Sequence, residues 1–477
     1  MSENTSAPSM ENAYKLDGRV PFGSAALLGL QHVLAMFAGN LTPVNLITGA
    51  CNLQDLQVSL LQNAMLVAGI VTLVQLFTIG PIGAKLPIVM GTSSGFIGIC
   101  NNIISMMGGG VLAYGTLMGA SLIGGLMETV LGFFIKPLSK FFPSIVTGTV
   151  VLAIGLSLIS VGITSFAGGS GVADYGALPN MAVGAIVLVV IIIFKHFTKG
   201  VTSNSAILFG IIAGYIVCGI MGLFLPTTFV DADGVTQTYA WVLDWSAVAK
   251  ASWFSLPSIM PVKMHFELTA IIPMCIMFVV STVETVGDTS AITEGGLGRA
   301  PTGRELSGSI TCDGLGSSLA SLFGVLPNTS FAQNVGIITM TKIVNRFCIG
   351  IGACFLILCG LFPKLAALVS IMPQPVLGGA AVMMFASIIM SGIQLITKEP
   401  VTSRTITIVS VAIGFGYGLG SSAGVLSFMP QAVQYVFGGS GIVPAAVAAI
   451  IMNLVIPKDK PAAPVKKPAE QAAEKAE

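Results

Sequence analysis

The feature that most constrains this chain is a series of fourteen apolar stretches, each about 20 residues long and almost free of charge. Lipid offers no hydrogen bonds to a backbone, so only a helix or a closed barrel can cross a bilayer. The stretches are longer than barrel strands and show no polar–apolar alternation, so we expect helices. The expected spans are 24–48, 57–79, 84–106, 110–135, 143–166, 178–195, 203–225, 268–292, 306–324, 328–344, 347–370, 374–396, 404–421 and 438–456.

Charged residues are too scarce to build a surface that faces water. The 477 residues include 21 Lys and Arg and 20 Asp and Glu, or 9%, and fourteen of these charges lie in residues 1–23 and 457–477. A soluble domain carries about 25% charged residues. The composition therefore excludes a soluble or disordered chain. A net charge of +1 also argues against a nucleic-acid partner. We expect an all-α integral membrane protein whose main partner is the lipid bilayer.

The basic residues orient the expected spans. With a cytoplasmic N-terminus, 18 of the 21 basic residues, including Lys136 and Lys140, fall on the inner side, and only Lys250, Lys263 and Lys364 fall outside. Cytoplasmic loops are enriched in Lys and Arg. We therefore predict a multi-pass protein of the cell membrane with both termini in the cytoplasm.

Two of the stretches are poor continuous helices. The third contains Leu86-Pro87 followed by GTSSG, and the tenth contains Leu326-Pro327 followed by NTSF. They stand seven spans apart, as expected if seven spans are repeated in inverted orientation. Interrupted spans at matching positions of two halves indicate the central site of a transporter.

A few polar side chains lie within the spans, where an ionised group costs about 2.5 to 3.5 kcal/mol on insertion scales. Glu284 and Asp288 are four residues apart and share a helix face. We interpret Glu284 as functional, because it can exchange a proton and accept hydrogen bonds from a ligand. Asp288 and Asp313 either carry a coupling proton or tie helices together. Glu128 favours a structural role.

Other polar residues allow two interpretations each. His32 is either a buried core histidine or a member of a polar network. Gln333 and Asn334 adjoin the tenth-span break, and their amides offer both donors and acceptors to the edge of a heterocycle. Phe331 either stacks on a ring or packs in the ordinary way. The eight cysteines form no C-x-x-C, which predicts neither a metal site nor a disulfide framework.

Residues 333–342, QNVGIITMTK, resemble the signature of the nucleobase–ascorbate transporters, the second class of nucleobase:cation symporters. That signature is Gln, Glu or Pro, then Asn, any residue, Gly, four further residues, Thr, and Arg, Lys or Gly. Every constrained position matches. The Gln31-His32 pair and the acids at 284, 288 and 313 also fit, and the resemblance extends over residues 20–456.

This resemblance implies fourteen spans in two inverted seven-span repeats, with short strand-like breaks in spans 3 and 10. It implies a core domain that slides against a gate domain, and relatives of this fold often form homodimers through the gate. The implied divisions are a cytoplasmic N-terminal segment (1–23), core parts (24–141 and 268–370), gate parts (142–225 and 371–456), an extracytoplasmic loop (226–267) and a disordered cytoplasmic tail (457–477).

The resemblance also implies residue roles. Glu284 would hold one edge of a base, Gln333 the other edge, and Asn334 would shape the site. The implied proton-coupling network comprises Glu284, Asp288, Asp313 and His32.

One departure from the family concerns the third span. Many relatives place an aromatic residue directly after the serine of the break, whereas here Ser93 is followed by Ser94 and Gly95, with Phe96 further on. We still expect Ser93 and Ser94 to contribute to substrate binding, and Phe331 becomes the better candidate for stacking.

The function implied by the resemblance is proton-coupled uptake of a purine base. Glutamine at position 333 is similar to xanthine and uric acid members, whereas uracil members often carry glutamate. The alternatives are a uracil:proton symporter, an anion exchanger of similar architecture, a passive channel and a membrane enzyme. The chain lacks H-E-x-x-H and G-x-S-x-G, which argues against the enzyme. Sodium remains an alternative coupling ion, and we expect no metal or cofactor.

Overall fold

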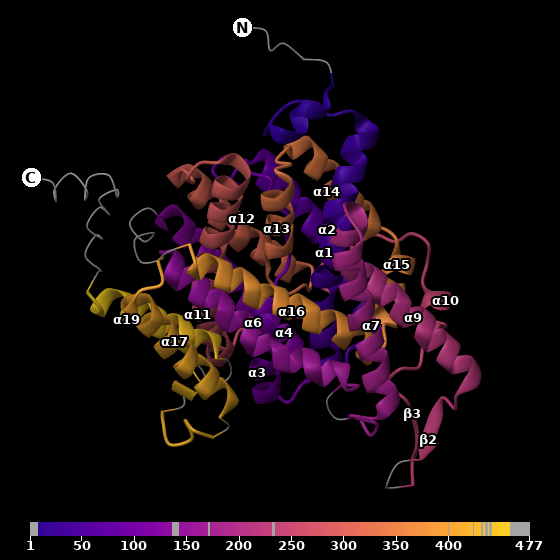
Figure 1. The fold of residues 1–477 in the computed structure, drawn as a ribbon. Helices are drawn as coiled ribbons and strands as arrows, with labels where there is room; N and C mark the ends of the chain where they lie inside the picture. Colours follow the sequence, from indigo (N-terminus) through magenta and orange to yellow (C-terminus); the bar gives the residue numbers. More distant parts are fainter. Residues whose placement is uncertain are drawn as a thin grey trace, which may run out of the picture.

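The structure is a computed structural model that describes residues 8–135, 143–169, 172–230, 234–398, 400–422, 424–430, 433–434, 437 and 441–457. Helices dominate it, and they pack into one bundle with the N-terminal segment at one end (Figure 1). The expected disordered tail and the charges at Lys136 and Lys140 lie outside the described residues, apart from Pro457.

The helices follow the expected spans closely. Their bounds are α1 Phe22–Ala50, α2 Gln54–Phe77, α3 Ile97–Met107, α4 Gly110–Phe133, α6 Ser144–Phe166, α7 Leu178–Phe197, α8 Val201–Asn204, α9 Ala206–Phe224, α10 Ser246–Lys250, α11 Leu268–Ala291, α12 Gly303–Leu322, α13 Ala332–Thr341, α14 Arg346–Cys359, α15 Pro363–Ser370, α16 Gln374–Ile396, α17 Ser403–Ser421 and α19 Ile442–Val455.

Short elements complete the fold. The strands pair as β1 with β4 and as β2 with β3. Their bounds, and those of the short helical turns, are β1 Met90–Thr92, β2 Thr228–Val230, β3 Thr236–Thr238, β4 Asn328–Ser330, η1 Met10–Tyr14, η2 Ser94–Phe96 and the π-helical turn η4 Ile292–Gly296.

Long apolar helices recur throughout the described chain. Within it, eight helices are long and apolar enough to cross a bilayer, and nine if the bent pair α14–α15 is one span. The prediction of an all-helical, multi-pass membrane protein is thereby confirmed.

One expected span differs in shape. The stretch 347–370 is not a straight helix, because α14 and α15 meet at 81°. Pro363 is the first residue of α15, where its missing N–H costs nothing but its ring prevents continuation from the previous helix. Gly360 ends the first segment, and a side chain there would overlap the backbone nitrogen of Leu66.

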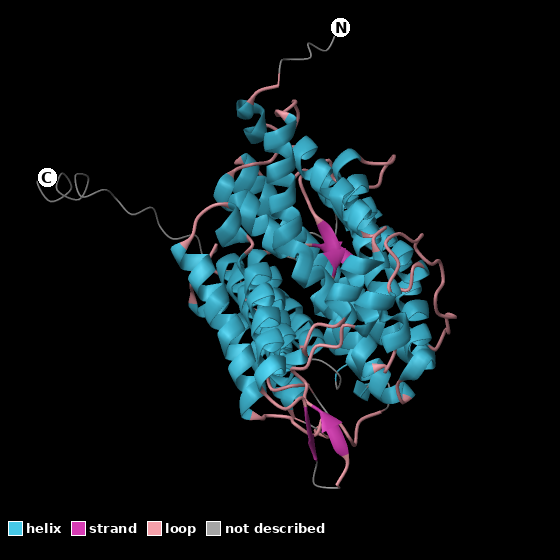
Figure 2. Ribbon diagram, turned by 90° about the vertical axis from the view of Figure 1, so that its right-hand side faces the viewer, coloured by secondary structure: helices cyan, strands magenta, loops and turns pink. Residues whose placement is uncertain are grey.

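The third and tenth stretches are helical over only part of their length. Helices α3 and α13 have 11 and 10 residues, or roughly 15 Å each at 1.5 Å per residue. That is about half of the hydrocarbon thickness. Ahead of each helix lies a short strand, β1 or β4. Figure 2 shows one strand pair enclosed by helices and a second pair at one end of the molecule.

The helices pack in two sets. In the first set α4 packs on α12, α2 on α14, and α1 on both α2 and α14; in the second, α16 packs on α6 and α7, and α17 on α19. Glycines allow the closest approaches. A side chain at Gly314 would overlap the backbone nitrogen of Thr129 in the first set, and one at Gly392 would overlap that of Leu152 in the second.

Candidate functional site

The centre of the bundle is built around the pairing of β1 with β4. The strands are antiparallel, with Met90 opposite Ser330 and Thr92 opposite Asn328. All six strand residues are buried. The pairing extends by one bond at each end, where Ser93 N donates to Pro327 O and Phe331 N donates to Val89 O, each at 2.9 Å. Two segments about 240 residues apart therefore form one rigid unit.

Side chains of α1 and α2 satisfy the other edge of β1. Met90 N donates to Thr72 Oγ1 at 2.9 Å, and Thr92 N donates to Asn40 Oδ1 at 2.7 Å. Buried backbone groups need partners of this kind. The strand is thereby fixed on both edges, so the helix that follows it starts at a defined depth.

Asp288 of α11 and Asp313 of α12 each have a hydroxyl partner. Ser330 Oγ of β4 donates to Asp288 Oδ2 at 2.7 Å. Thr285 of α11 donates to the carboxylate of Asp313, and both residues are fully buried. The first bond ties α11 to the tenth-span break, and the second ties α11 to α12.

His32 and Asn334 contact one another. The Asn334 amide donates to His32 O at 3.0 Å and lies 3.0 Å from His32 Nδ1. Both residues are buried. This pair joins the first helix to α13.

Glu284 lies beside the third-span break. It is half-buried, and a Cβ added at Gly95 would lie 3.8 Å from Glu284 Oε2 and 3.4 Å from Ser93 Oγ. Within the part of the chain described, its carboxyl group has neither a hydrogen bond nor an ion pair. Ser93 is buried and Ser94 is half-buried. The glutamate and these two serines therefore share one region, and the carboxyl group is available to a ligand.

Phe331 is held by close packing. Its ring fits against two glycines, so that a Cβ at Gly39 would lie 2.7 Å from the ring and a Cβ at Gly91 2.9 Å from it. Only 6% of the side chain is exposed. These contacts fix the ring against α1 and β1.

Gln333 lines a cavity of about 330 Å³ between the two sets of helices. Its walls come from α1, α7, α8, α9, α13 and α16. A second cavity of about 380 Å³ adjoins it and is lined by Asp288 of α11, Thr339 of α13 and Lys398 beyond α16. Of the residues described, Glu284 lines neither cavity. The arrangement thus brings Gln333 and Asp288 to neighbouring spaces and leaves Glu284 outside both.

Glu128 is completely buried, away from these cavities. Its Oε1 accepts a hydrogen bond from Thr282 Oγ1 at 3.1 Å, while its Oε2 has no partner among the described residues. The bond joins α4 to α11.

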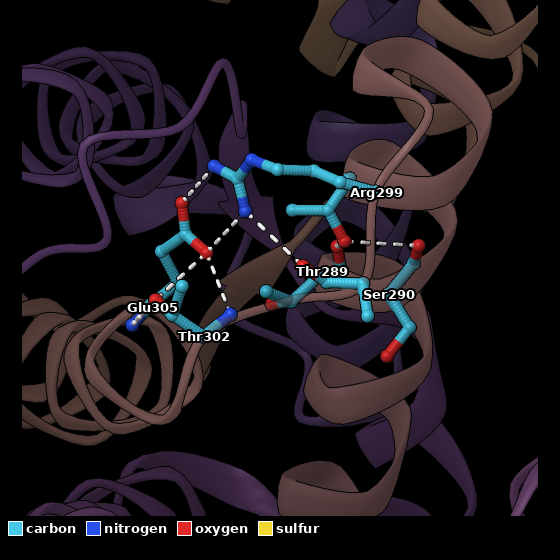
Figure 3. Close-up of polar contacts among 7 residues, drawn as sticks. Thr289, Ser290, Arg299, Thr302 and Glu305 are labelled. Carbon is cyan, nitrogen blue, oxygen red and sulfur yellow. Dashed lines mark hydrogen bonds and ion pairs between the residues drawn. The ribbon is translucent and has the colours of Figure 1, made fainter.

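The helix that carries Asp313 is anchored at its first residues. Figure 3 shows the Arg299 guanidinium group directed at the Glu305 carboxylate, with contacts of 2.5 and 2.9 Å. Glu305 also accepts a hydrogen bond from Thr302 N, and Thr302 Oγ1 accepts one from Glu305 N. This reciprocal capping box fixes the start of α12.

Several contributors to the site had weak sequence signals. Serine and threonine are common in this chain, so the sequence does not single out Ser330 or Thr285. Their importance appears only from their hydrogen bonds to Asp288 and Asp313. Asn40 lies within a long apolar stretch, where an amide is costly without a partner. Across the described residues, no group of three or more His, Cys, Asp or Glu side chains is arranged to hold a metal ion.

Solved structures share this fold. The transmembrane domain of BicA, a cyanobacterium bicarbonate transporter, matches 90% of this chain and 97% of its own with a TM-score of 0.53 and 14% identity. Similarity at so low an identity shows the fold alone. The protein is therefore an all-helical, multi-pass membrane protein of this architecture.

The family follows from sequence. The chain matches the Permease family (Xan_ur_permease) over residues 23–423. It belongs to this family, the nucleobase–ascorbate transporters that the signature indicated, and is a permease and not an enzyme.

Relatives of known name cover nearly the whole chain. A Clostridium perfringens relative is 34% identical over 94% of this chain and 93% of its own. The xanthine permease XanP of Escherichia coli (strain K12) is 30% identical over 94% of this chain and 96% of its own. The uric acid permease PucK of Bacillus subtilis (strain 168) is 33% identical over 91% of this chain and 96% of its own.

Proposed function

We propose that the protein takes up a purine base, namely xanthine and also uric acid, together with protons. The observation that carries this proposal is Gln333, the first residue of a complete family signature, on a cavity between two sets of helices. Relatives named as xanthine and uric acid permeases support a purine over uracil. An anion exchanger would not be expected to keep an unpaired carboxyl group such as Glu284 near its site.

In the proposed site, Glu284 and Gln333 bind the two edges of the purine. Ser93, Ser94, Asn334 and Phe331 shape the space around it. The hydrogen bonds Ser330–Asp288 and Thr285–Asp313 support a coupling network of Glu284, Asp288, Asp313 and His32, because each would change when a carboxyl group gains or loses a proton. Protons are proposed as the coupling ion because these carboxyl groups can each gain or lose one.

The proposed cycle is alternating access. The fourteen spans form two inverted seven-span repeats, broken by strands in spans 3 and 10. Core parts 24–141 and 268–370 slide against gate parts 142–225 and 371–456, with loop 226–267 outside and segments 1–23 and 457–477 in the cytoplasm. The protein lies in the cell membrane as a homodimer through its gate. The two sets of packed helices and the cavities between them support this division.

Uptake of radiolabelled xanthine, uric acid, hypoxanthine and uracil in a transporter-null cell tests the proposal. We expect accumulation of xanthine against its gradient, abolished by an uncoupler, and no competition from uracil. Accumulation of uracil instead would identify the symporter alternative, and equilibration without accumulation would identify a channel.

A further inference from the structure

Two neighbouring cavities meet at one point of the bundle. The cavity lined by Gln333 and the cavity lined by Asp288 share four wall residues. Two come from α13 and two come from α16, on the opposite side. The shared residues are Ala332, Gly336, Ser391 and Gln394. A ligand that passes between the cavities must pass between these helices.

The α13 side of this junction is flat. A Cβ added at Gly336 would meet no atom within 4 Å, so open space lies in front of its backbone. Gly336 is the glycine of the family signature. A planar ring can approach the backbone of a glycine more closely than the backbone of a residue that carries a side chain.

The α16 side carries polar groups. Ser387, Ser391 and Gln394 follow one another at intervals of four and three residues, so they lie on one helix face. The hydroxyl groups of Ser387 and Ser391 donate to carbonyl oxygens one turn earlier, at 2.8 and 3.1 Å. The exposed side chain of Gln394 has no hydrogen-bond partner in the described part of the chain. Gln394 is therefore the member of this face that offers a free donor and a free acceptor together.

We infer that Gln394 is a specificity-determining residue, whose amide pairs with the polar edge of the purine from the α16 side. The inference rests on the proposed function and deepens it, because the residues expected from the family all lie on α1, α11, α12, α13 or the breaks. Selection would then involve both sets of helices: Gln333 reads the base from α13, and Gln394 reads it across the junction.

Competition of labelled xanthine uptake by unlabelled xanthine, uric acid and hypoxanthine tests this role. Gln394→Met keeps the length of the side chain but loses both polar groups, and Gln394→Asn keeps the amide but shortens it. We expect inhibition constants for xanthine to rise roughly three- to tenfold in Gln394→Met and less in Gln394→Asn, as for the loss of one hydrogen bond. The ranking of the three purines should also change, since they differ in their carbonyl groups.

The matched control is Gln434→Met, since Gln434 is a half-buried glutamine that lines neither cavity. It should behave as wild type. Unchanged inhibition constants and ranking in Gln394→Met would overturn the inference. If that variant is absent from the membrane, unchanged constants in Gln394→Asn would do so. Failure of the wild-type protein to take up any purine would instead overturn the proposed function, so the two failures are distinguishable.

Discussion

Glu284 and Asp288 stand one helical turn apart, yet they have different surroundings. Asp288 accepts a hydrogen bond from Ser330, whereas the carboxyl group of Glu284 has no partner in the described chain. Their four-residue spacing predicts a shared helix face, but no sequence pattern predicts that Ser330 reaches Asp288. That contact depends on the pairing of two strands from distant segments.

Replacing Gln333 with alanine should reduce xanthine uptake by more than about tenfold, because the base would lose hydrogen bonds in a confined site. Uptake of labelled xanthine, normalised to the protein in the membrane, measures the effect. Gln434→Ala provides the matched control. Normal uptake kinetics in Gln333→Ala would remove Gln333 from the site.

Replacing Glu284 with glutamine should abolish accumulation of xanthine against a gradient, because the amide keeps the shape of the side chain but cannot release a proton. Initial uptake rates as a function of external pH, with and without uncoupler, measure the change. Glu128→Gln is the control, since that buried acid is tied to Thr282 away from the cavities. Wild-type proton dependence in Glu284→Gln would refute the coupling role.

At the scale of elements, apolar length predicts where helices occur but not how they bend or pair. Each of the fourteen expected stretches overlaps at least one helix of the described chain. The bend before Pro363 was missed because a first-turn proline is compatible with either a new helix or a kink. The register of β1 with β4 was not predictable, because two strands of three residues each are too short to show a polar–apolar alternation.

Replacing Gly314 with alanine should destabilise the contact between α12 and α4, because the added methyl group would overlap the Thr129 backbone. We expect a loss of about 1 to 3 kcal/mol, typical of overpacking. Thermal unfolding of the purified protein in detergent measures it. Gly222→Ala in α9 is the control, since a Cβ there meets nothing within 4 Å. Equal melting temperatures for both variants would contradict close packing at this crossing.

At the scale of the whole molecule, an ion pair connects η4 to the segment that follows α16, beside the second cavity. Lys398 Nζ, beyond the end of α16, lies 3.0 Å from Glu294 Oε2 in η4, which continues α11. Both side chains are partly exposed, so the pair contributes little to stability. The pair is useful because it marks the distance between η4 and the end of α16. Alternating access would change that distance.

A covalent link across this pair should therefore stop transport. Cysteines introduced at Glu294 and Lys398, joined by a short bismaleimide, should reduce xanthine uptake to background, while each single variant treated alike should remain active. The background should carry Cys354→Ser, because that native cysteine is exposed. Full uptake by protein shown to be crosslinked would argue against relative movement at this position.

The strand β1 has a consequence for biosynthesis. Its strand partner is translated about 240 residues later, so the first half of the chain must enter the lipid with one edge of the strand unsatisfied. Thr72 and Asn40 already hold the opposite edge and precede β1 in the chain. They can hold the nascent β1 segment in an extended conformation until β4 has been synthesised. Loss of these two side chains should therefore stall folding before β1 pairs with β4.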